Sequence, residues 1–148
     1  MPMKITRFRD DYEFLSNFYP SPIEMDGMTY PTVEHAYQAA KTENETVRRK
    51  IADLAHPGAA KAAGRRLARP DNWFEINLQL MEDLVRQKFT THADLRNKLL
   101  ATGDAELIEG NSWNDKFFGM TWDKNKNVLS GENHLGQILM RVRTEFAE

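Results

Sequence analysis

The chain has 148 residues, of which 41% are hydrophobic and 28% are charged, and its formal net charge is −2. This length fits one domain with a single core, and the composition is that of a globular protein. A charge this close to zero argues against a broad electrostatic surface for nucleic acid, while a local basic patch stays open. The absence of cysteine excludes disulfides, thiolate metal ligands and cysteine nucleophiles.

We expect a single domain over residues 1–148, because no repeat, linker or shift in composition divides the sequence. The charged segment 1–11 lacks the apolar stretch of a signal peptide, and no apolar run approaches the length of a membrane span. We therefore expect a cytoplasmic protein with no membrane partner. The scattered histidines show no ligand spacing, so we expect no metal and no cofactor.

The first thirty residues are predicted to be mainly irregular. Segment 15–22 contains two prolines and several turn-forming residues, which predicts an ordered loop. Within 23–30, the pair Asp26-Gly27 between short apolar stretches predicts a hairpin turn.

The rest of the chain is predicted to be dominated by helices, over 32–41, 45–55, 57–67, 75–89, 93–101 and 134–146. Thr32 is the expected N-cap of the first helix, Pro57 suits the first turn of the third, and Gly103 ends the fifth. In the fourth helix, the apolar face is expected to contain Ile76, Leu80, Leu84 and Phe89. A short strand is predicted at 107–109 and a loop-rich segment over 110–132. The fold class is mainly α, an α+β chain with a small β component.

The helix predicted at 32–41 carries a line of polar residues next to its apolar face. Glu34, Gln38 and Lys41 follow one another at i, i+4 and i+7, beside the core face that contains Tyr37. Polar residues at the margin of a core often line a cleft. The spacing alone is equally that of a solvated edge, and it favours that interpretation.

Two other places concentrate residues that could bind a ligand. The loop 111–119 contains Trp113 and Asp115 among amide side chains, which suits a nucleobase and ribose hydroxyls but also suits a plain turn. In the alanine-rich third helix, Lys61 and Arg65 lie one turn apart, where they could hold a phosphate or could be ordinary surface cations.

Two sequence blocks carry a resemblance to a known family. Segment 14–20 (FLSNFYP) and segment 30–41 (YPTVEHAYQAAK) resemble the signature of the YbiA-like, or NADAR, family. Further matches follow in the family's order at Ala60-Lys61, Gly64-Arg65, Trp73, Lys88-Phe89, 99–103, Asp115, Asn133, Leu135-Gly136, Leu139-Met140 and Arg143. The resemblance covers essentially the whole chain, and it implies a compact, single-domain YbiA-like helical fold.

The resemblance also implies an N-glycosidase. One branch of the family is linked to reactive phosphoribosyl intermediates of riboflavin synthesis, and another to removal of ADP-ribose from guanine. Two positions depart from the family pattern. Phe118-Gly119 replaces the usual Trp-Gly pair and lacks the indole N–H, while Asn77 stands where an arginine is common.

Cleavage of a ribosyl–nitrogen bond needs a carboxylate near the anomeric carbon. From the resemblance we expect Glu34 as the principal acid/base or charge-stabilising group and Asp115 as the residue that holds the ribose or the water. Lys41 is the alternative, a Schiff-base nucleophile. The expected substrate contacts are aromatic rings for the base, a polar contact and cations for the phosphate: Phe18, Trp113, Phe118, Asn17, Lys61 and Arg65.

Two other classes of function stay open at this point. A non-catalytic ADP-ribose or nucleotide-binding module would use the same pocket without hydrolysis. A purely structural protein would leave the line of polar residues at Glu34 and the loop at Trp113 without a common purpose. The sequence predicts neither the oligomeric state nor the leaving base.

Overall fold

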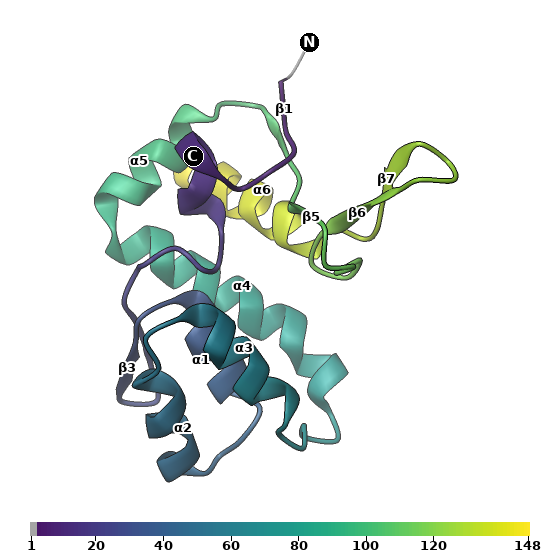
Figure 1. Ribbon diagram of the computed structural model, residues 1–148. Helices are drawn as coiled ribbons and strands as arrows, with labels where there is room; N and C mark the ends of the chain where they lie inside the picture. The colour runs from purple at the N-terminus through teal and green to yellow at the C-terminus, as the bar shows by residue number, and fades with distance from the viewer. Residues whose placement is uncertain (1–2) are drawn as a thin grey trace. The chain divides into compact units, whose positions relative to one another are not determined.

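A computed structural model describes residues 3–148 and divides them into two compact units. The first unit contains residues 3–16 and 93–148, and the second unit is Asn17–His92. Helices account for most of the regular structure in both units, with short strands between them (Figure 1). The predicted class, mainly α with a small β component, is confirmed. Within the described part of the chain, no helix combines the length and the apolarity needed to cross a membrane.

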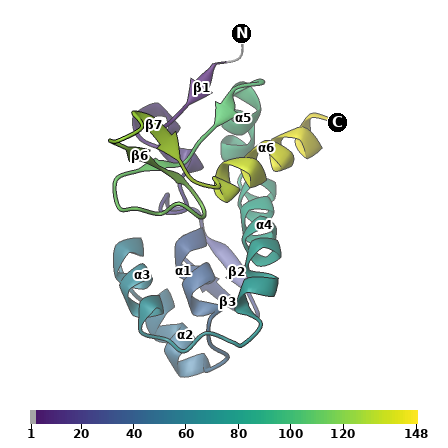
Figure 2. The ribbon, with the colours of Figure 1, turned by 90° about the vertical axis from the view of Figure 1, so that its right-hand side faces the viewer.

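The second unit is built around one short helix, α1 (Val33–Ala39), every residue of which is buried. The hairpin of β2 (Ile23–Met25) and β3 (Met28–Tyr30) leads into it. Around it pack α2 (Glu45–Ala52), α3 (Pro57–Arg65) and α4 (Trp73–Thr91), as Figures 1 and 2 show. The predicted hairpin and helices are therefore confirmed, with ends that differ by a few residues.

Thr32 and His35 fix the start of α1. The Thr32 hydroxyl oxygen accepts a hydrogen bond from the His35 backbone N–H at 3.1 Å, which makes Thr32 the N-cap as predicted. The same hydroxyl lies 2.7 Å from His35 Nδ1, and His35 Nε2 lies 2.9 Å from the Leu54 carbonyl oxygen. Because that carbonyl can only accept, Nε2 carries the proton and Nδ1 accepts from Thr32. This ring joins the start of α1 to the chain that follows α2.

The buried face of α4 differs from the one predicted. Ile76 is 40% exposed and lies outside the core, although Leu84 and Phe89 are buried as expected. The face is rotated so that it also contains polar side chains, and its members are Trp73, Asn77, Met81, Leu84, Val85, Lys88 and Phe89. The apolar pattern failed to predict this register because Asn77 and Lys88, which a hydrophobicity count places outside, are only 2% and 1% exposed.

The first unit combines short strands with two helices. Strand β1 (Lys4–Ile5) pairs in parallel with β4 (Glu106–Leu107), and the 3-10 helix η1 (Asp10–Leu15) follows β1. A second, three-stranded sheet contains β5 (Gly110–Asn111), β6 (Met120–Asp123) and β7 (Val128–Ser130). Helices α5 (Ala93–Ala101) and α6 (His134–Ala147) complete the unit (Figure 1).

The segment 110–132, predicted to be loop-rich, also contains three short strands that the sequence did not predict, β5, β6 and β7. These strands are two to four residues long, which is too short to produce an alternating pattern in the sequence. They are held by turns, such as the one in which Asp123 Oδ1 accepts hydrogen bonds from the backbone N–H groups of Asn125 and Lys126.

Asn133 connects the start of α6 to β4 and the residues that follow it. Its backbone has φ 54°, in the left-handed region that asparagine tolerates. Its side-chain Nδ2 donates to the Leu107 carbonyl at 3.0 Å, and its Oδ1 accepts from the Glu109 N–H at 3.0 Å. This arrangement satisfies two backbone groups beside β4 and sets where α6 begins.

His35 predicts a pH dependence of stability. Burial lowers the pKa of the His35 ring below its usual 6.5, so the unfolded chain takes up a proton at this position before the native protein does. Stability should therefore fall as the pH drops through about 6.5. Urea unfolding at about pH 7 and pH 5 measures this. The loss between the two values should be smaller in His35→Gln, while the exposed control His56→Gln should behave like the wild type. Equal losses in all three would contradict the assignment.

Candidate active site

Glu34 is a buried carboxylate at the first turn of α1. It is 7% exposed, and Gln38, one turn later, is 5% exposed and donates from Nε2 to Glu34 Oε1 at 3.2 Å. The solvated edge that the spacing favoured is therefore wrong for these two residues. A buried carboxylate is costly to desolvate, so such a group is kept where hydrogen bonds and nearby positive charge stabilise it.

Gly64 of α3 makes room for the Gln38 side chain. A Cβ atom at position 64 would fall on the side-chain atoms of Gln38, including its Cβ. The two helices α1 and α3 can therefore approach closely at this point only because position 64 has no side chain. This explains in physical terms why a glycine stands in the alanine-rich helix next to the candidate site.

Lys41 lies just beyond α1, beside two aromatic rings. Its Nζ is 6.0 Å from the centre of the Tyr37 ring and 5.9 Å from that of Trp73, and the two rings are 5.2 Å apart. Burial lowers the pKa of Lys41, the Glu34 carboxylate opposes this, and Arg69 and Arg65 lower the pKa further. A lysine with a lowered pKa has a larger neutral fraction near pH 7, which is the form that acts as a nucleophile.

Asn77 lies on the α4 side of this cluster and is only 2% exposed. Its Nδ2 donates to the Tyr37 hydroxyl oxygen at 3.4 Å. Among residues 3–148, neither Asn77 Oδ1 nor Gln38 Oε1 has a hydrogen-bond donor, although both atoms are buried. Buried acceptors without partners are uncommon in folded proteins and call for a donor from water or a ligand. At the position where the family often has arginine, this chain thus has the neutral side chain of Asn77, which donates a hydrogen bond to Tyr37.

Cations lie on α3 and just after it. Arg65 and Arg69 are exposed, and both are close enough to Lys41 to affect its pKa. Arg69 also stacks on the exposed Phe74, with its guanidinium carbon 4.7 Å from the ring centre. Lys61 is half-buried one turn before Arg65. Of the two predicted phosphate contacts, Arg65 is therefore the one whose charge lowers the pKa of Lys41.

The predicted contacts Asn17 and Phe18 precede the hairpin in the same unit. The Asn17 carbonyl oxygen accepts from the Glu34 backbone N–H at 3.2 Å, so this loop anchors the turn that carries Glu34. The Asn17 side chain donates to the sulfur of Met81 at 3.4 Å. Phe18 is 40% exposed, which leaves part of its ring accessible for stacking.

The remaining predicted residues belong to the first unit, in the loop between β5 and β6. Asp115 Oδ1 accepts from the backbone N–H groups of Phe117 and Phe118, both at 3.0 Å, and Asn111 brackets Asp115 through its backbone at 2.8 and 3.0 Å. Asp115 therefore shapes the loop as a turn residue. Trp113 is 49% exposed, so its ring lies at the surface rather than in the core.

Phe118 and Gly119 correspond to the family's aromatic-Gly pair. The Phe118 ring meets that of Phe117 edge-to-face, with ring centres 4.9 Å apart. A Cβ at position 119 would fall on the backbone oxygen of Glu109. The glycine of this pair is thus explained by close packing against Glu109.

A groove of about 770 Å³ lies in the first unit. Its lining includes three exposed cations and no carboxylate, together with Trp122, which is 50% exposed. The cations are Arg7 and Arg9, between β1 and η1, and Lys124 after β6. This is the local basic patch that the net charge left open, and the sequence hid it because its cations come from two distant segments.

Sequence reasoning did not assign a role to several residues of the candidate site. Tyr37 was expected only as a core residue, whereas its ring lies beside Lys41 and its hydroxyl contacts Asn77. Trp73 gave a signal, as one match in the resemblance, but no role followed from it. Arg69 gave no signal, because nothing in its local sequence relates it to α1. Across residues 3–148, no group of three or more histidine or acidic side chains is placed to hold a metal ion.

Comparison with known proteins gives a consistent result over the whole chain. A family model described as the NADAR domain matches residues 5–147. The N-glycosidase YbiA of Escherichia coli is 40% identical over 140 residues, which cover 93% of this chain and 84% of that protein. An N-glycosidase of Nostoc punctiforme is 41% identical over 141 residues, covering 91% and 86%.

A further relative and a solved structure agree with this result. A riboflavin biosynthesis protein of Vibrio vulnificus is 39% identical over 145 residues, covering 94% of this chain but only 37% of that protein. The solution NMR structure of E. coli YbiA matches with a TM-score of 0.81 and 38% identity, over 99% of this chain and 87% of that one. The predicted YbiA-like fold is confirmed, and the relatives' names agree with the predicted enzyme class, a hydrolase of N-glycosyl bonds.

Gly64→Ala should disturb the candidate site without touching a reactive group. The added methyl group must push the Gln38 side chain away from its place beside Glu34, at a cost of about 1–3 kcal/mol in the free energy of unfolding. Thermal unfolding should show the loss, and turnover should fall with it. The exposed helical glycine Gly58, whose Cβ would meet nothing, provides the control Gly58→Ala. A Gly64→Ala protein as stable and active as this control would contradict the packing argument.

Proposed function

The chain belongs to the NADAR domain family, and we propose that it is an N-glycosidase that hydrolyses the ribosyl–nitrogen bond of a nucleotide-like substrate. The observation that carries this proposal is the buried carboxylate of Glu34, held by Gln38 and placed close enough to Lys41 to influence its pKa. A hydrolase of this kind needs a desolvated carboxylate next to polar groups that can bind a sugar.

Cleavage passes through a state in which positive charge develops on the anomeric carbon. The bond from that carbon to nitrogen breaks, and the electron pair leaves with the nitrogen. Glu34 stabilises the positive charge and accepts a proton from the attacking water, whose oxygen forms the new bond to carbon. The leaving nitrogen takes up that proton from Glu34, which regenerates the carboxylate, so the products are the base with its N–H restored and the sugar phosphate.

We assign Asp115 to the ribose or to the water. One of its carboxylate oxygens accepts hydrogen bonds from two backbone N–H groups, which fixes the carboxylate in the loop. The other oxygen is the atom that we assign to a ribose hydroxyl. Trp113, Phe118 and Phe18 are the proposed stacking rings for the base, and exposure of Trp113 and Phe18 supports this.

We propose two candidate substrates, a phosphoribosylaminopyrimidine of riboflavin synthesis and ADP-ribosylated guanine. The relatives named for riboflavin biosynthesis support the first. Both substrates carry phosphate, and the cations near Lys41 suit a phosphate at that place. We assign Arg65 and Lys61 to it, with Arg69 as an addition from the structure.

Lys41 offers a second route to the same products. A ribosylamine can open to an imine, and the neutral lysine amine can then attack its carbon and expel the base amine. Water hydrolyses the resulting lysine imine and returns the amine. The lowered pKa of Lys41 supports this route, because it increases the neutral fraction of the amine.

Product analysis by mass spectrometry tests the proposed function. The purified protein is incubated with a phosphoribosylaminopyrimidine and, separately, with guanine-linked ADP-ribose in a DNA oligonucleotide. We expect release of the base, or of unmodified DNA, together with the sugar phosphate. Glu34→Gln should lower turnover about 100-fold or more, because it removes the charge and the proton acceptor. Glu75→Gln, an exposed change on α4, should have no effect.

Each outcome of that experiment has a defined meaning. Release from one substrate that is lost in Glu34→Gln selects the branch and supports the assignment of Glu34. Near-normal turnover in a folded Glu34→Gln protein removes Glu34 from the reaction. Tight binding of either substrate without release overturns the glycosidase and favours the alternative, a non-catalytic ADP-ribose or nucleotide-binding module.

Borohydride trapping distinguishes the two routes. If Lys41 forms an imine, reduction during turnover should leave a stable sugar adduct on Lys41, located by peptide mass spectrometry, and Lys41→Met should abolish it. The rate should then rise as the pH increases through the lowered pKa of Lys41, since the neutral amine is the reactive form. Turnover with no adduct, or with an undiminished rate in Lys41→Met, leaves hydrolysis assisted by Glu34 as the mechanism.

A further inference from the structure

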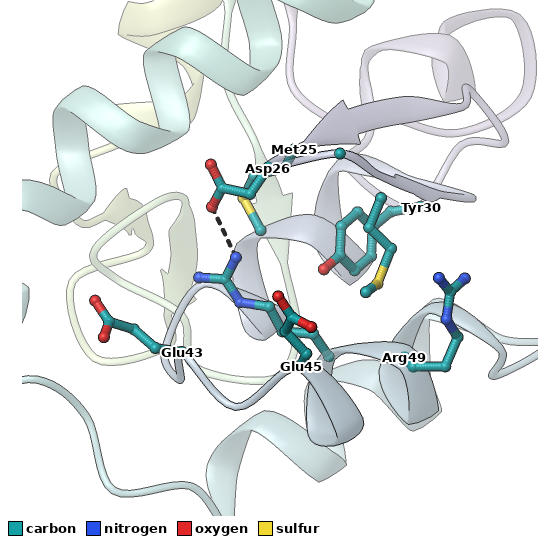
Figure 3. Close-up of a pocket in the computed structure, with 9 residues that line it drawn as sticks. Met25, Asp26, Tyr30, Glu43, Glu45 and Arg49 are labelled. Carbon is teal, nitrogen blue, oxygen red and sulfur yellow. Dashed lines mark hydrogen bonds and ion pairs between the residues drawn. The ribbon is translucent and has the colours of Figure 1, made fainter.

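The Asn17–His92 unit also contains a hollow, which lies between the β2–β3 hairpin and α2 (Figure 3). We call it the hairpin pocket. Its volume is about 370 Å³, within the range of small-molecule sites. None of the residues assigned to the glycosidase lines it, and its lining consists of Met25, Asp26, Gly27, Met28, Tyr30, Glu43, Glu45, Arg48 and Arg49.

Tyr30 is the most unusual of these residues. Its side chain is fully buried, and no donor or acceptor among residues 3–148 makes a hydrogen bond with its hydroxyl. In Figure 3 the hydroxyl is turned toward the side of the pocket where Glu45 lies. Burial raises the pKa of Tyr30, so the hydroxyl stays protonated and can either donate or accept. Leaving such a group without a partner costs free energy, and a ligand in the pocket would remove that cost.

The guanidinium group of Arg48 already interacts with other groups of the protein. Its Nη1 lies 2.7 Å from Asp26 Oδ2, and its Nε donates to the Thr42 carbonyl at 2.7 Å. This pairing ties the hairpin turn to α2 and neutralises Asp26 (Figure 3). Arg48 and Asp26 therefore line the pocket as an ion pair and add no net charge to it.

The other charged side chains that line the hairpin pocket are of both signs, and the two signs lie on different sides of Tyr30 (Figure 3). Glu43, Glu45 and Arg49 are exposed and form no ion pair with any residue that the structure describes. In Figure 3, Glu43 and Glu45 lie on one side of Tyr30 and Arg49 lies on the other. A purely anionic ligand would face two carboxylates, and a purely cationic ligand would face a guanidinium. A ligand that carries both charges meets a complementary group at each end.

We propose that the hairpin pocket binds a small zwitterion with a free ammonium and a free carboxylate, an α-amino acid or a dipeptide. The ammonium lies against Glu43 and Glu45, and the carboxylate accepts hydrogen bonds from Arg49. The Tyr30 hydroxyl makes a hydrogen bond to the polar backbone of the ligand. The thioethers of Met25 and Met28 contact its carbon atoms, because methionine side chains adapt to varied shapes. This site does not depend on the glycosidase reaction.

An NMR titration of the full-length protein tests the proposal with matched probes. L-Leucine and glycyl-L-leucine carry both charges, N-acetyl-L-leucine keeps only the carboxylate, and L-leucinamide keeps only the ammonium. We expect the zwitterions to shift the backbone amide signals of Gly27, Glu45 and Arg49 in a saturable way. The two single-charge analogues should bind about 10-fold more weakly or worse, since each loses one charged contact.

Variants locate the binding. Arg49→Gln, Glu45→Gln and Tyr30→Phe should each weaken binding of the zwitterions about 10-fold. The exposed changes Arg66→Gln and Glu75→Gln, outside the pocket, serve as charge-matched controls and should leave binding unchanged. Arg49 and Glu45 are exposed, so their variants test the proposal even if Tyr30→Phe, a change in the core, does not fold.

Three results would overturn the proposal. The first is no saturable shift with either zwitterion, which would mean that the hairpin pocket does not bind this class of ligand. The second is equal binding of the zwitterions and a single-charge analogue, which would remove the recognition of two charges. The third is unchanged binding in both Arg49→Gln and Glu45→Gln, which would place the ligand elsewhere. Glycosidase turnover is not a readout in any of these measurements.

Discussion

His35 holds the start of α1 through both nitrogens of its ring. Nδ1 accepts from Thr32, and Nε2 donates to the carbonyl of Leu54. The ring is fully buried, so these bonds have no competition from water, and each contributes about 1 kcal/mol net to stability. Because Thr32 also caps the helix, one small network fixes where α1 begins and how it meets the end of α2. Glu34 lies between these two residues, so its direction follows from the same network.

The central position of α1 explains why polar residues on it matter. A helix that is buried along its whole length can present a carboxylate only to a dry environment, and Glu34 meets Gln38 there. Gly64 supplies the space that Gln38 needs, while Tyr37 and Trp73 cover Lys41. The cost of desolvating these groups is borne by the packing of α2, α3 and α4 around α1. Stability and the proposed chemistry therefore depend on the same short helix.

The second unit contains two places that differ in their balance of charges. Near Lys41, the cations Arg65 and Arg69 accompany one buried carboxylate, and this balance favours an anionic group. In the hairpin pocket, carboxylates outnumber cations and both signs are present. The hairpin leads directly through Tyr30 and Pro31 into α1, so one continuous segment contributes to both places. Each place can be tested without the other, because they share no assigned residue.

The sequence alone determined the helical segments of this protein and the block that carries Glu34. Local signals are sufficient for these features, since the N-cap Thr32, Pro57 in the first turn of α3 and the glycine at 103 act on their own neighbours. Resemblance over separated blocks predicted the family, which the comparisons confirm. The residue roles at Glu34, Asp115 and Lys41, and the extent of the domain, stay predictions.

Only the tertiary structure decided which polar residues are buried and which cations lie together. Spacing favoured a solvated edge for Glu34 and Gln38, but burial of a helix face depends on what packs against it from elsewhere in the chain. The same reason explains the wrong face predicted for α4, whose Asn77 and Lys88 are buried by contacts that no local pattern records. Short strands such as β5 to β7 depend on pairing between distant residues. Non-local packing is thus the physical reason that the chemistry of the site was not determined by the sequence pattern.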